Sequence, residues 1–220
     1  MPWSEEHKQK TRERILDAAA TLFRERGLEQ TTVAEVMQLA GLTHGGFYAH
    51  FGSKDELVAE AFAHASEQLR RLFTAAPTGD VSVNSLLSAA EKYLSIGHMT
   101  HPQRGCPVAA FGTELIRGST RVRQRLSEEI QVRLAKLCEG TDARLPEAIR
   151  RSQAAGALAC MVGGQVLARG LEESEGREFL DACRRFLKTA LEATGAGPEN
   201  SGFNTNRRKS VRRPRRNGAR

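Results

Sequence analysis

The sequence has few aromatic residues and few cysteines. Aromatic residues make up 5% of its 220 residues, and its four cysteines, at positions 106, 138, 160 and 183, form no CxxC pair. Because structural zinc sites use closely spaced cysteine pairs, this spacing argues against a zinc ribbon. Reduced thiols in a cytosol are the simplest interpretation. We expect neither a metal nor a cofactor.

Long apolar runs are also missing. The longest nearly apolar stretch, Ala154 to Ala168, contains Gln165 and three glycines, whereas a helix that spans a bilayer needs about 20 apolar residues. The first fourteen residues are mostly polar and charged, so we expect no secretory leader. These features predict a cytoplasmic protein without a membrane partner, in which 154–168 is a buried helix.

The sequence lacks the residue combinations that mark most enzymes. We find no nucleophile–base pair, no paired carboxylates and no glycine loop of the kind that cradles phosphates. We therefore predict that the protein is not an enzyme.

The net charge of +7 comes from one end of the chain. Eight of the 33 Lys and Arg residues lie between Arg207 and Arg220 without an acidic residue, which leaves 25 basic and 26 acidic residues before them. The total charge therefore does not by itself indicate a nucleic-acid partner. We predict that residues 196–220 are a disordered basic tail. This tail is either a solvated end or an arm that adds non-specific affinity for phosphates.

Apolar residues recur at helical spacing along nearly the whole chain, and no convincing strand pair is found. Glycines, including Gly27, Gly41 and Gly97, follow or end several of these periodic segments. The segment APTGD at 76–80 is predicted to be a loop between two parts of the chain. The fold class is therefore all-α. The predicted helices cover about 6–26, 33–40, 44–51, 54–72, 83–97, 107–115, 122–137, 146–169 and 179–191.

Two capping boxes stand close together near the N-terminus. Thr32 with Glu35 and Ser53 with Glu56 both fit the S/T-x-x-E pattern that starts helices. The order of helix, tight turn and short helix over 32–51 is typical of a helix-turn-helix motif, whose second helix enters the major groove of DNA.

The second helix contains two adjacent glycines, Gly45 and Gly46, each of which costs about 1 kcal/mol in helix propensity. Phe47 and Phe51 are four residues apart and are expected to anchor the helix on the core. Glycine allows a backbone to approach bases or phosphates closely. We therefore interpret the pair as an adaptation to a groove, although two glycines are also compatible with a plain loop.

The stretch TRERILDAAATLFRERGLEQTTVAEVMQLAGLTHGGFYAHFGSKDELVAEAF resembles the DNA-binding domain of the TetR/AcrR family of bacterial transcriptional regulators. The resemblance covers about residues 9–69, with the helix-turn-helix motif at 32–51. It implies that 76–195 form a helical ligand-binding and dimerisation domain. Gly45-Gly46 departs from many members, which carry larger residues there. By position, the resemblance implies base contacts from Thr43, His44 and Gly45 and phosphate contacts from Thr32, Tyr48, His50 and Lys54.

Each of these phosphate contacts has a simpler alternative. Thr32 is first of all a helix cap, and Tyr48 fits as half-buried filler. His50 and Lys54 fit as ordinary solvated surface residues.

The last two helices have the composition of a dimer interface. The segment around 154–168 is rich in small residues and is apolar nearly all round. If the last two helices pair with the same two helices of a second copy across a two-fold axis, they form a four-helix bundle. The alternative is an ordinary central core helix. Our interface candidates are Ala155, Leu158, Val162, Gln165, Val166 and Phe186.

The effector pocket implied by the resemblance is expected among the helices from 83 to 169. By residue type alone, its candidate lining is Tyr93, Met99, Phe111, Leu115 and Met161.

Cys106 precedes Pro107, which fits the first position of a helix. A thiol at that N-cap would have a lowered pKa because of the helix dipole, and Arg104 would act in the same direction. Cys106 is therefore a candidate redox or electrophile sensor, with a small buried hydrophobe as the alternative. A metal site of His98, His101 and Cys106 is the weaker reading.

The leading hypothesis is a ligand-responsive repressor that binds a palindromic double-stranded DNA operator as a homodimer in the bacterial cytoplasm, at the nucleoid. Its small-molecule effector is unknown. The alternative is a regulator switched through Cys106 without a bound effector.

Overall fold

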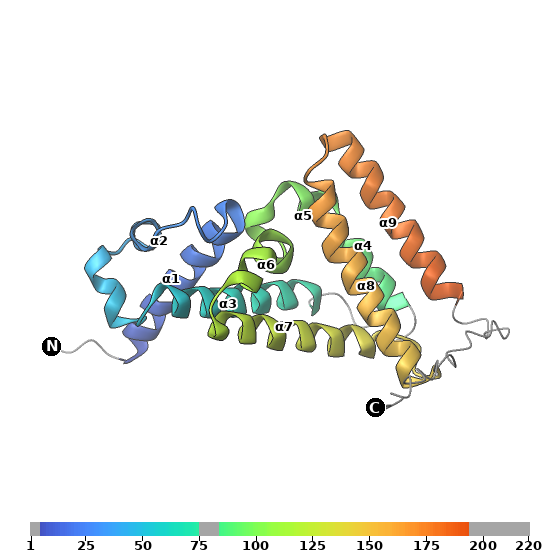
Figure 1. The fold of residues 1–220 in the computed structure, drawn as a ribbon, viewed down its shortest axis with the longest axis horizontal. Helices are drawn as coiled ribbons and strands as arrows, with labels where there is room; N and C mark the ends of the chain where they lie inside the picture. Colours follow the sequence, from blue (N-terminus) through green and yellow to red (C-terminus); the bar gives the residue numbers. More distant parts are fainter. Residues whose placement is uncertain (1–4, 75–83, 194–220) are drawn as a thin grey trace, which may run out of the picture.

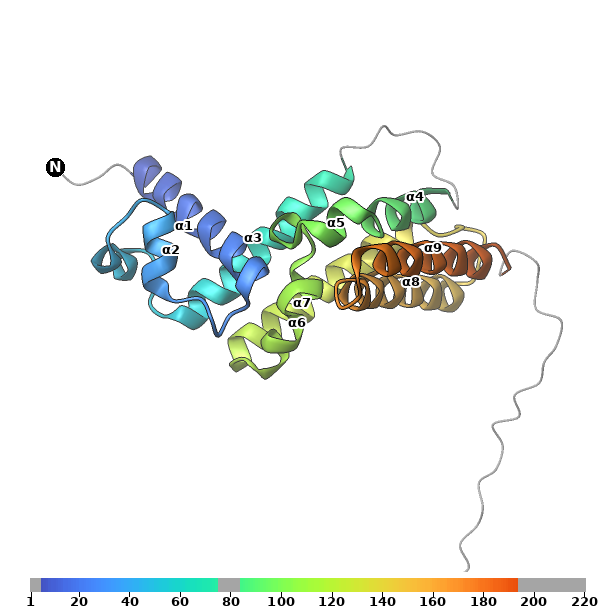
Figure 2. The ribbon, with the colours of Figure 1, turned by 90° about the horizontal axis from the view of Figure 1, so that it is seen from above.

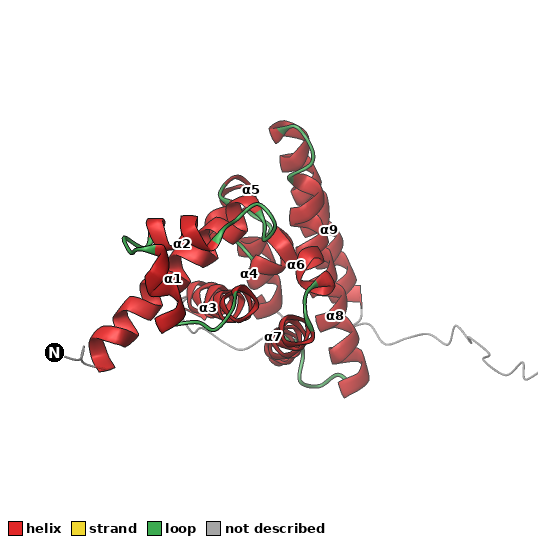
Figure 3. Ribbon diagram, turned by 60° about the vertical axis from the view of Figure 1, so that its left-hand side comes forward, coloured by secondary structure: helices red, strands yellow, loops and turns green. Residues whose placement is uncertain are grey.

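The computed structural model describes residues 5–74 and 84–193. This part of the chain consists of helices and short turns without a strand, which confirms the all-α prediction (Figure 3). The predicted loop at 76–80 and the tail at 196–220 lie outside the described residues. The elements are α1 (Glu5–Arg26), α2 (Val33–Leu39), η1 (His44–Ala49), α3 (Lys54–Thr74), α4 (Asn84–Tyr93), α5 (Ile96–Thr100), η2 (Pro102–Arg104), α6 (Pro107–Arg117), α7 (Thr120–Glu139), α8 (Glu147–Ala168) and α9 (Glu173–Ala193).

The helix-turn-helix segment lies at one end of the molecule and the last two helices lie at the other (Figure 1). Helix α3 packs on α1 and also on α7, so it connects the two ends. Helices α8 and α9 lie side by side, with α4 along the same end (Figure 2).

Glycines end the first two helices as predicted. Gly27 and Gly41 have φ angles of 82° and 69°, a left-handed conformation that glycine adopts without strain. The prediction that Gly97 ends a helix is wrong. Helix α4 ends at Tyr93, and the Ser95 hydroxyl caps a new helix, α5, that contains Gly97.

One hydrophobic core joins the N-terminal helices to α6 and α7. The Phe111 ring packs edge-on against Phe23 of α1 and Phe62 of α3, each at a centroid distance of 6.1 Å. Phe111 has non-helical angles (φ −141°, ψ 21°), so α6 is kinked where this ring enters the core. The helix-turn-helix end is therefore packed directly on the C-terminal part of the chain.

A second core lies between α4, α8 and α9. It is built from leucines, alanines and methionines and includes Leu94, Met161 and Leu180, all buried. Its small residues bring α8 and α9 close together.

Candidate nucleic-acid interface

The second helix of the motif is shorter and tighter than predicted. The sequence predicted an α-helix from 44 to 51 capped by Thr43, whereas η1 is a 3₁₀ helix over His44–Ala49 and the Thr43 side chain makes no cap hydrogen bond. Two consecutive glycines weaken α-helix formation, and 3₁₀ helices occur as short pieces of this length. The Thr43 side chain is exposed and does not serve as a cap.

The two faces of η1 differ as the sequence predicted. Phe47 and Phe51 are each 1% exposed and stack with their ring centroids 5.7 Å apart. On the other side, Tyr48 is 70% exposed, and His44 and Gly45 are also exposed. The aromatic pair anchors the element and leaves the opposite face open to a partner.

The fold itself does not require glycine at position 45. A Cβ atom added there would have no heavy atom within 4 Å, and one at Gly46 would make an ordinary contact of 3.6 Å with Met37. Neither glycine has a positive φ angle. Neither a steric contact nor a positive φ angle therefore explains the pair, and close approach to a partner would explain it.

Thr32 is a helix cap with its hydroxyl already engaged. Its Oγ1 accepts from Glu35 N at 3.2 Å and donates to Glu35 Oε2 at 2.7 Å, while Thr32 N donates to the same carboxylate at 2.8 Å. The hydrogen bond from the Thr32 backbone is the main reason why the pKa of Glu35 is lowered. Thr32 is thus first a structural residue, and a phosphate would have to replace Glu35 as its partner.

Lys54 also has a structural contact. Its Nζ donates to the backbone oxygen of Leu28 at 2.7 Å, which ties the start of α3 to the turn after α1. An ammonium group has three donors, so two remain for other partners.

His50 lies half-buried beside basic residues of α1. Burial lowers its pKa, and the nearby charges of Lys8 and Arg12 lower it further. Its Nδ1 atom is buried without a hydrogen-bond partner among the described residues. Lys8, an exposed cation close to His50, was missed by the sequence analysis because nothing in its helical period distinguishes it from any solvated lysine.

Three of the six predicted interface residues are exposed on α8 and α9. Phe186 is 65% exposed, Val166 and Ala155 are exposed, and Leu158 and Val162 are half-buried. Gln165 corrects the prediction. It is 0% exposed, and its Nε2 donates to the backbone oxygen of Tyr93 at 2.6 Å. The buried amide holds α8 to the end of α4 and does not face outward.

The five predicted pocket residues are divided between the two cores. Phe111 and Leu115 belong to the first core, whereas Tyr93, Met99 and Met161 belong to the second. All five are buried and packed, because the residue types that line pockets are also those that fill cores. A small cavity of about 20 Å³ lies elsewhere, between Leu86, Thr141 and Leu191.

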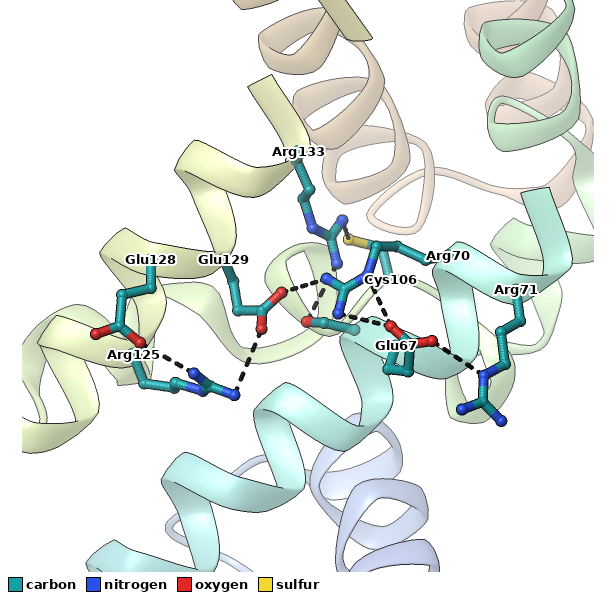
Figure 4. Close-up of polar contacts among 9 residues, drawn as sticks. Glu67, Arg70, Arg71, Cys106, Arg125, Glu128, Glu129 and Arg133 are labelled. Atoms are coloured by element: carbon teal, nitrogen blue, oxygen red, sulfur yellow. Dashed lines mark hydrogen bonds and ion pairs between the residues drawn. The ribbon is translucent and has the colours of Figure 1, made fainter. Parts of the chain in front are cut away.

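Cys106 occupies the predicted N-cap position before Pro107 but is 0% exposed. Its partner is Arg133 of α7, whose Nη1 lies 3.1 Å from Cys106 Sγ (Figure 4). Burial raises the pKa of this thiol, but the Arg133 charge and hydrogen bonds from Tyr93, the Ala109 backbone and Arg133 outweigh burial and lower the pKa. Arg104 is exposed, so the predicted contribution from this residue belongs to Arg133 instead.

His98 has a structural role beside Cys106. His98 Nε2 accepts from Cys106 N at 2.7 Å, and its Nδ1 lies 2.7 Å from the backbone oxygen of Tyr93. Burial lowers the pKa of His98 to about 4, so the ring is neutral at neutral pH. Both ring nitrogens are occupied, and the described residues contain no group of three or more potential metal ligands. The metal reading of His98, His101 and Cys106 gains no support from this arrangement.

An ionic network beside Cys106 joins α3 to α7 (Figure 4). Arg70 pairs with the buried Glu129 at 2.5 Å and with Glu67 at 2.8 Å. Arg133 adds a bond from its Nη2 to Ser66 of α3 at 3.3 Å. The helix that supports the helix-turn-helix end is therefore fastened to α7 through a partly buried polar cluster.

No helix in the described ranges has the length and apolar character needed to cross a bilayer.

The sequence is similar to a known family and to several curated proteins. Residues 15–61 match the model of the bacterial regulatory proteins of the tetR family. Two uncharacterized HTH-type transcriptional regulators of Mycobacterium tuberculosis are 32% identical over 120 residues, which is 54% of this chain and 59% of theirs. The HTH-type transcriptional regulator TtgR of Pseudomonas putida is 46% identical over 55 residues, which is 25% of this chain and 26% of its own.

Solved structures match over a longer range. A TetR transcriptional regulator from Chloroflexus aurantiacus has a TM-score of 0.66 and 26% identity, covering 84% of this chain and 96% of its own. A regulator from Cytophaga hutchinsonii has a TM-score of 0.73 at 19% identity, covering 88% and 98%. The matched proteins are regulators rather than enzymes, in line with the sequence-based prediction. The curated mycobacterial relatives, by contrast, are matched over less than two thirds of their length.

Proposed function

Because its N-terminal domain belongs to the TetR family of bacterial regulatory proteins, we propose that this chain is a ligand-responsive repressor that binds a palindromic operator as a homodimer. The proposal includes a cytoplasmic location at the nucleoid and an operator of double-stranded DNA. It divides the chain into a DNA-binding domain at 9–69 and a ligand-binding and dimerisation domain at 76–195.

The outward face of η1 carries the DNA-binding part of the proposal. Phe47 and Phe51 are buried, so His44, Gly45 and Tyr48 face away from the core together. An imidazole and a phenol donate hydrogen bonds to base edges or phosphates, and a glycine lets the backbone come close. Gly45 has free space above it, which fits a groove rather than an internal contact.

The exposed apolar side of α8 and α9 supports a homodimer. Val166, Leu167 and Phe186 are large hydrophobic residues that water contacts in the single chain. A second copy related by a two-fold axis would cover the same residues on both chains and form a four-helix bundle. Such a dimer also provides two copies of η1, as an operator with two inverted half-sites requires.

Ligand response requires a path from the C-terminal helices to η1. Phe111 of α6 contacts Phe23 and Phe62, so a shift of α6 changes the packing of both α1 and α3. Because the candidate pocket residues are packed, we propose that the effector binds to a more open arrangement of these helices and shifts the population towards it. Such a shift would change the separation of the two DNA-contacting elements in the dimer.

The Arg133–Cys106 contact favours a second candidate function, a regulator switched by oxidation or alkylation of Cys106 without a bound effector. A thiolate is the reactive form of cysteine, and the adjacent guanidinium favours it. The thiol is fully buried, so this switch needs a transient opening near the start of α6. Modification of the Cys106 sulfur would disrupt its hydrogen bond with Arg133 of α7.

The test of the main proposal is selection of duplexes from a random-sequence pool by the purified full-length protein. We expect enrichment of a sequence with two inverted half-sites. The double variant H44A/Y48A should bind the selected duplex at least about tenfold more weakly, because each base or phosphate contact is worth about 1–3 kcal/mol. H101A, which changes an exposed histidine outside the motif, is the matched control. A folded H44A/Y48A protein with unchanged affinity would refute the assignment of this face.

A further inference from the structure

Two cysteines from neighbouring helices meet between α8 and α9. Cys160 belongs to α8 and Cys183 to α9, and both are free and half-buried. The Sγ atom of Cys160 lies 3.9 Å from the backbone oxygen of Cys183, to which it donates. The two helices run side by side in both views (Figures 1 and 2).

A glycine of α8 faces Cys183 at this point. Gly164 lies one turn after Cys160, and a Cβ atom added there would be 3.4 Å from Cys183 Sγ and 2.9 Å from Leu94 Cδ2. A larger residue at 164 would displace the Leu94 side chain and would come into van der Waals contact with Cys183 of α9. The contact between the two cysteines is therefore a consequence of close helix packing.

Cys183 also influences the acidity of the Cys160 thiol. Burial raises the pKa of Cys160 to about 11, and the charge and hydrogen bond of Cys183 contribute to that shift. The Cys160 sulfur is in contact with Cys183, and a disulfide requires the two Cα atoms to be about 4–7 Å apart.

We propose that Cys160 and Cys183 are a dithiol that a low-molecular-weight disulfide oxidises to an intramolecular disulfide linking α8 to α9. In the first step, the thiolate of one cysteine attacks a sulfur of the external disulfide, and one low-molecular-weight thiolate leaves. In the second step, the thiolate of the other cysteine attacks the resulting mixed disulfide and displaces the protein-bound half as a second thiolate. The two protein thiols lose two protons and two electrons, and the external disulfide is reduced to two thiols.

The position of the pair distinguishes it from Cys106. Cys160 and Cys183 are half-buried at the edge of the second core, whereas Cys106 is fully buried, so an external disulfide needs a smaller opening to reach the pair. The raised pKa of Cys160 means that the reaction accelerates as the pH rises. A link at this site would fix the spacing of the two helices that carry Val166 and Phe186 on their outer side. The proposal does not depend on DNA binding.

The test treats the reduced full-length protein with oxidised glutathione and maps disulfides by mass spectrometry of peptides under non-reducing conditions. We expect a loss of about 2 Da for two hydrogen atoms and a linked peptide pair that contains Cys160 and Cys183. C160S and C183S should each abolish the link, whereas C138S, which replaces another half-buried cysteine, should retain it. The oxidised protein should also unfold at a higher temperature than the reduced one, and C160S should show no such difference.

The proposal would be overturned by stable glutathione adducts on Cys160 or Cys183 without a link, by a link between two chains, or by a link that requires Cys106 or Cys138. A folded protein whose Cys160 and Cys183 remain reduced after the treatment would also overturn it.

Discussion

The carboxylate of Glu114 in α6 accepts a hydrogen bond from the backbone N–H of Leu28, with a distance of 2.7 Å between Oε2 and N. The same oxygen accepts from the N–H of Glu29 at 3.1 Å. Lys54 of α3 holds the carbonyl of Leu28 from the other side. The turn that precedes the helix-turn-helix motif is therefore fastened to α6 as well as to α3, and a displacement of α6 acts directly on it.

Removal of this carboxylate should destabilise the fold. In E114A, two backbone donors lose their partner, so we expect the free energy of unfolding to fall by about 1–3 kcal/mol. Urea denaturation monitored by circular dichroism measures the change. E128A removes an exposed ion pair on α7 and should change the free energy of unfolding by at most about 1 kcal/mol. Equal losses in both variants would mean that Glu114 is an ordinary surface acid.

Gly45 offers a test of DNA contact that leaves the fold intact. G45A adds a methyl group into open space, so the melting temperature should stay the same or rise slightly. If η1 lies in a groove, the methyl group meets bases or phosphates and the affinity for the selected duplex falls. G97A adds the same group at another glycine with nothing within 4 Å and should leave DNA affinity unchanged. Equal DNA affinity of G45A and wild type would show that the backbone at 45 does not approach the duplex.

The exposed apolar side of α8 and α9 predicts a specific oligomeric state. F186E places a charge in the proposed seam, so we expect dissociation to monomers in light scattering and loss of operator binding. I116E introduces the same charge at a residue that is 61% exposed on α6, outside the seam, and should remain dimeric. A monomeric wild-type protein, or a dimeric F186E, would remove α8 and α9 from the interface.

Local sequence signals predicted the helix-turn-helix end well because its structure is determined locally. The Thr32–Glu35 capping box, the glycines after α1 and α2, and the burial of Phe47 and Phe51 are all present. The capping box and the glycines depend on residues within a few positions of one another, and the i, i+4 spacing of the two phenylalanines places both on the face that packs on the core. The 3₁₀ conformation of η1 was not predicted. Propensity scales state how much glycine destabilises an α-helix, but they do not say which conformation replaces it.

Predictions about the C-terminal part failed where the partner lies far away in the sequence. Gln165 is buried because Tyr93, 72 residues earlier, offers a carbonyl, and no helical period contains that information. The Arg133–Cys106 contact spans 27 residues, whereas Arg104 is only two residues from Cys106 in the sequence, and sequence proximity therefore indicates the wrong arginine. The pocket residues were chosen by type, and type does not separate a core residue from a cavity lining.

The charge on Arg133 should control the titration of Cys106. In R133M, the pKa of the Cys106 thiol should rise, because burial then acts without the opposing cation. The ultraviolet absorbance of the thiolate against pH, measured in a C138S/C160S/C183S background, reports this pKa. R133K keeps a positive charge and should restore part of the shift. An unchanged pKa in R133M would show that the helix N-terminus, not the arginine, sets the thiol's acidity.

His98 should make the stability depend on pH in a defined window. Its pKa is about 4 in the folded protein and 6.5 without the fold, so between these values the unfolded chain binds a proton that the native protein does not. The stabilisation is therefore complete above about pH 6.5 and is lost as the pH falls towards 4, by an amount on the order of 3 kcal/mol. Protonation would also leave Nε2 unable to accept the N–H of Cys106. In H98Q this part of the pH dependence should disappear, whereas H101Q, which changes an exposed histidine, should keep it. Carboxylates contribute equally to the wild type, H98Q and H101Q. The difference between their urea midpoints, measured from pH 7 to pH 4, therefore isolates the contribution of His98. If the midpoints of H98Q and wild type changed in parallel with pH, His98 would not be the source of this pH dependence.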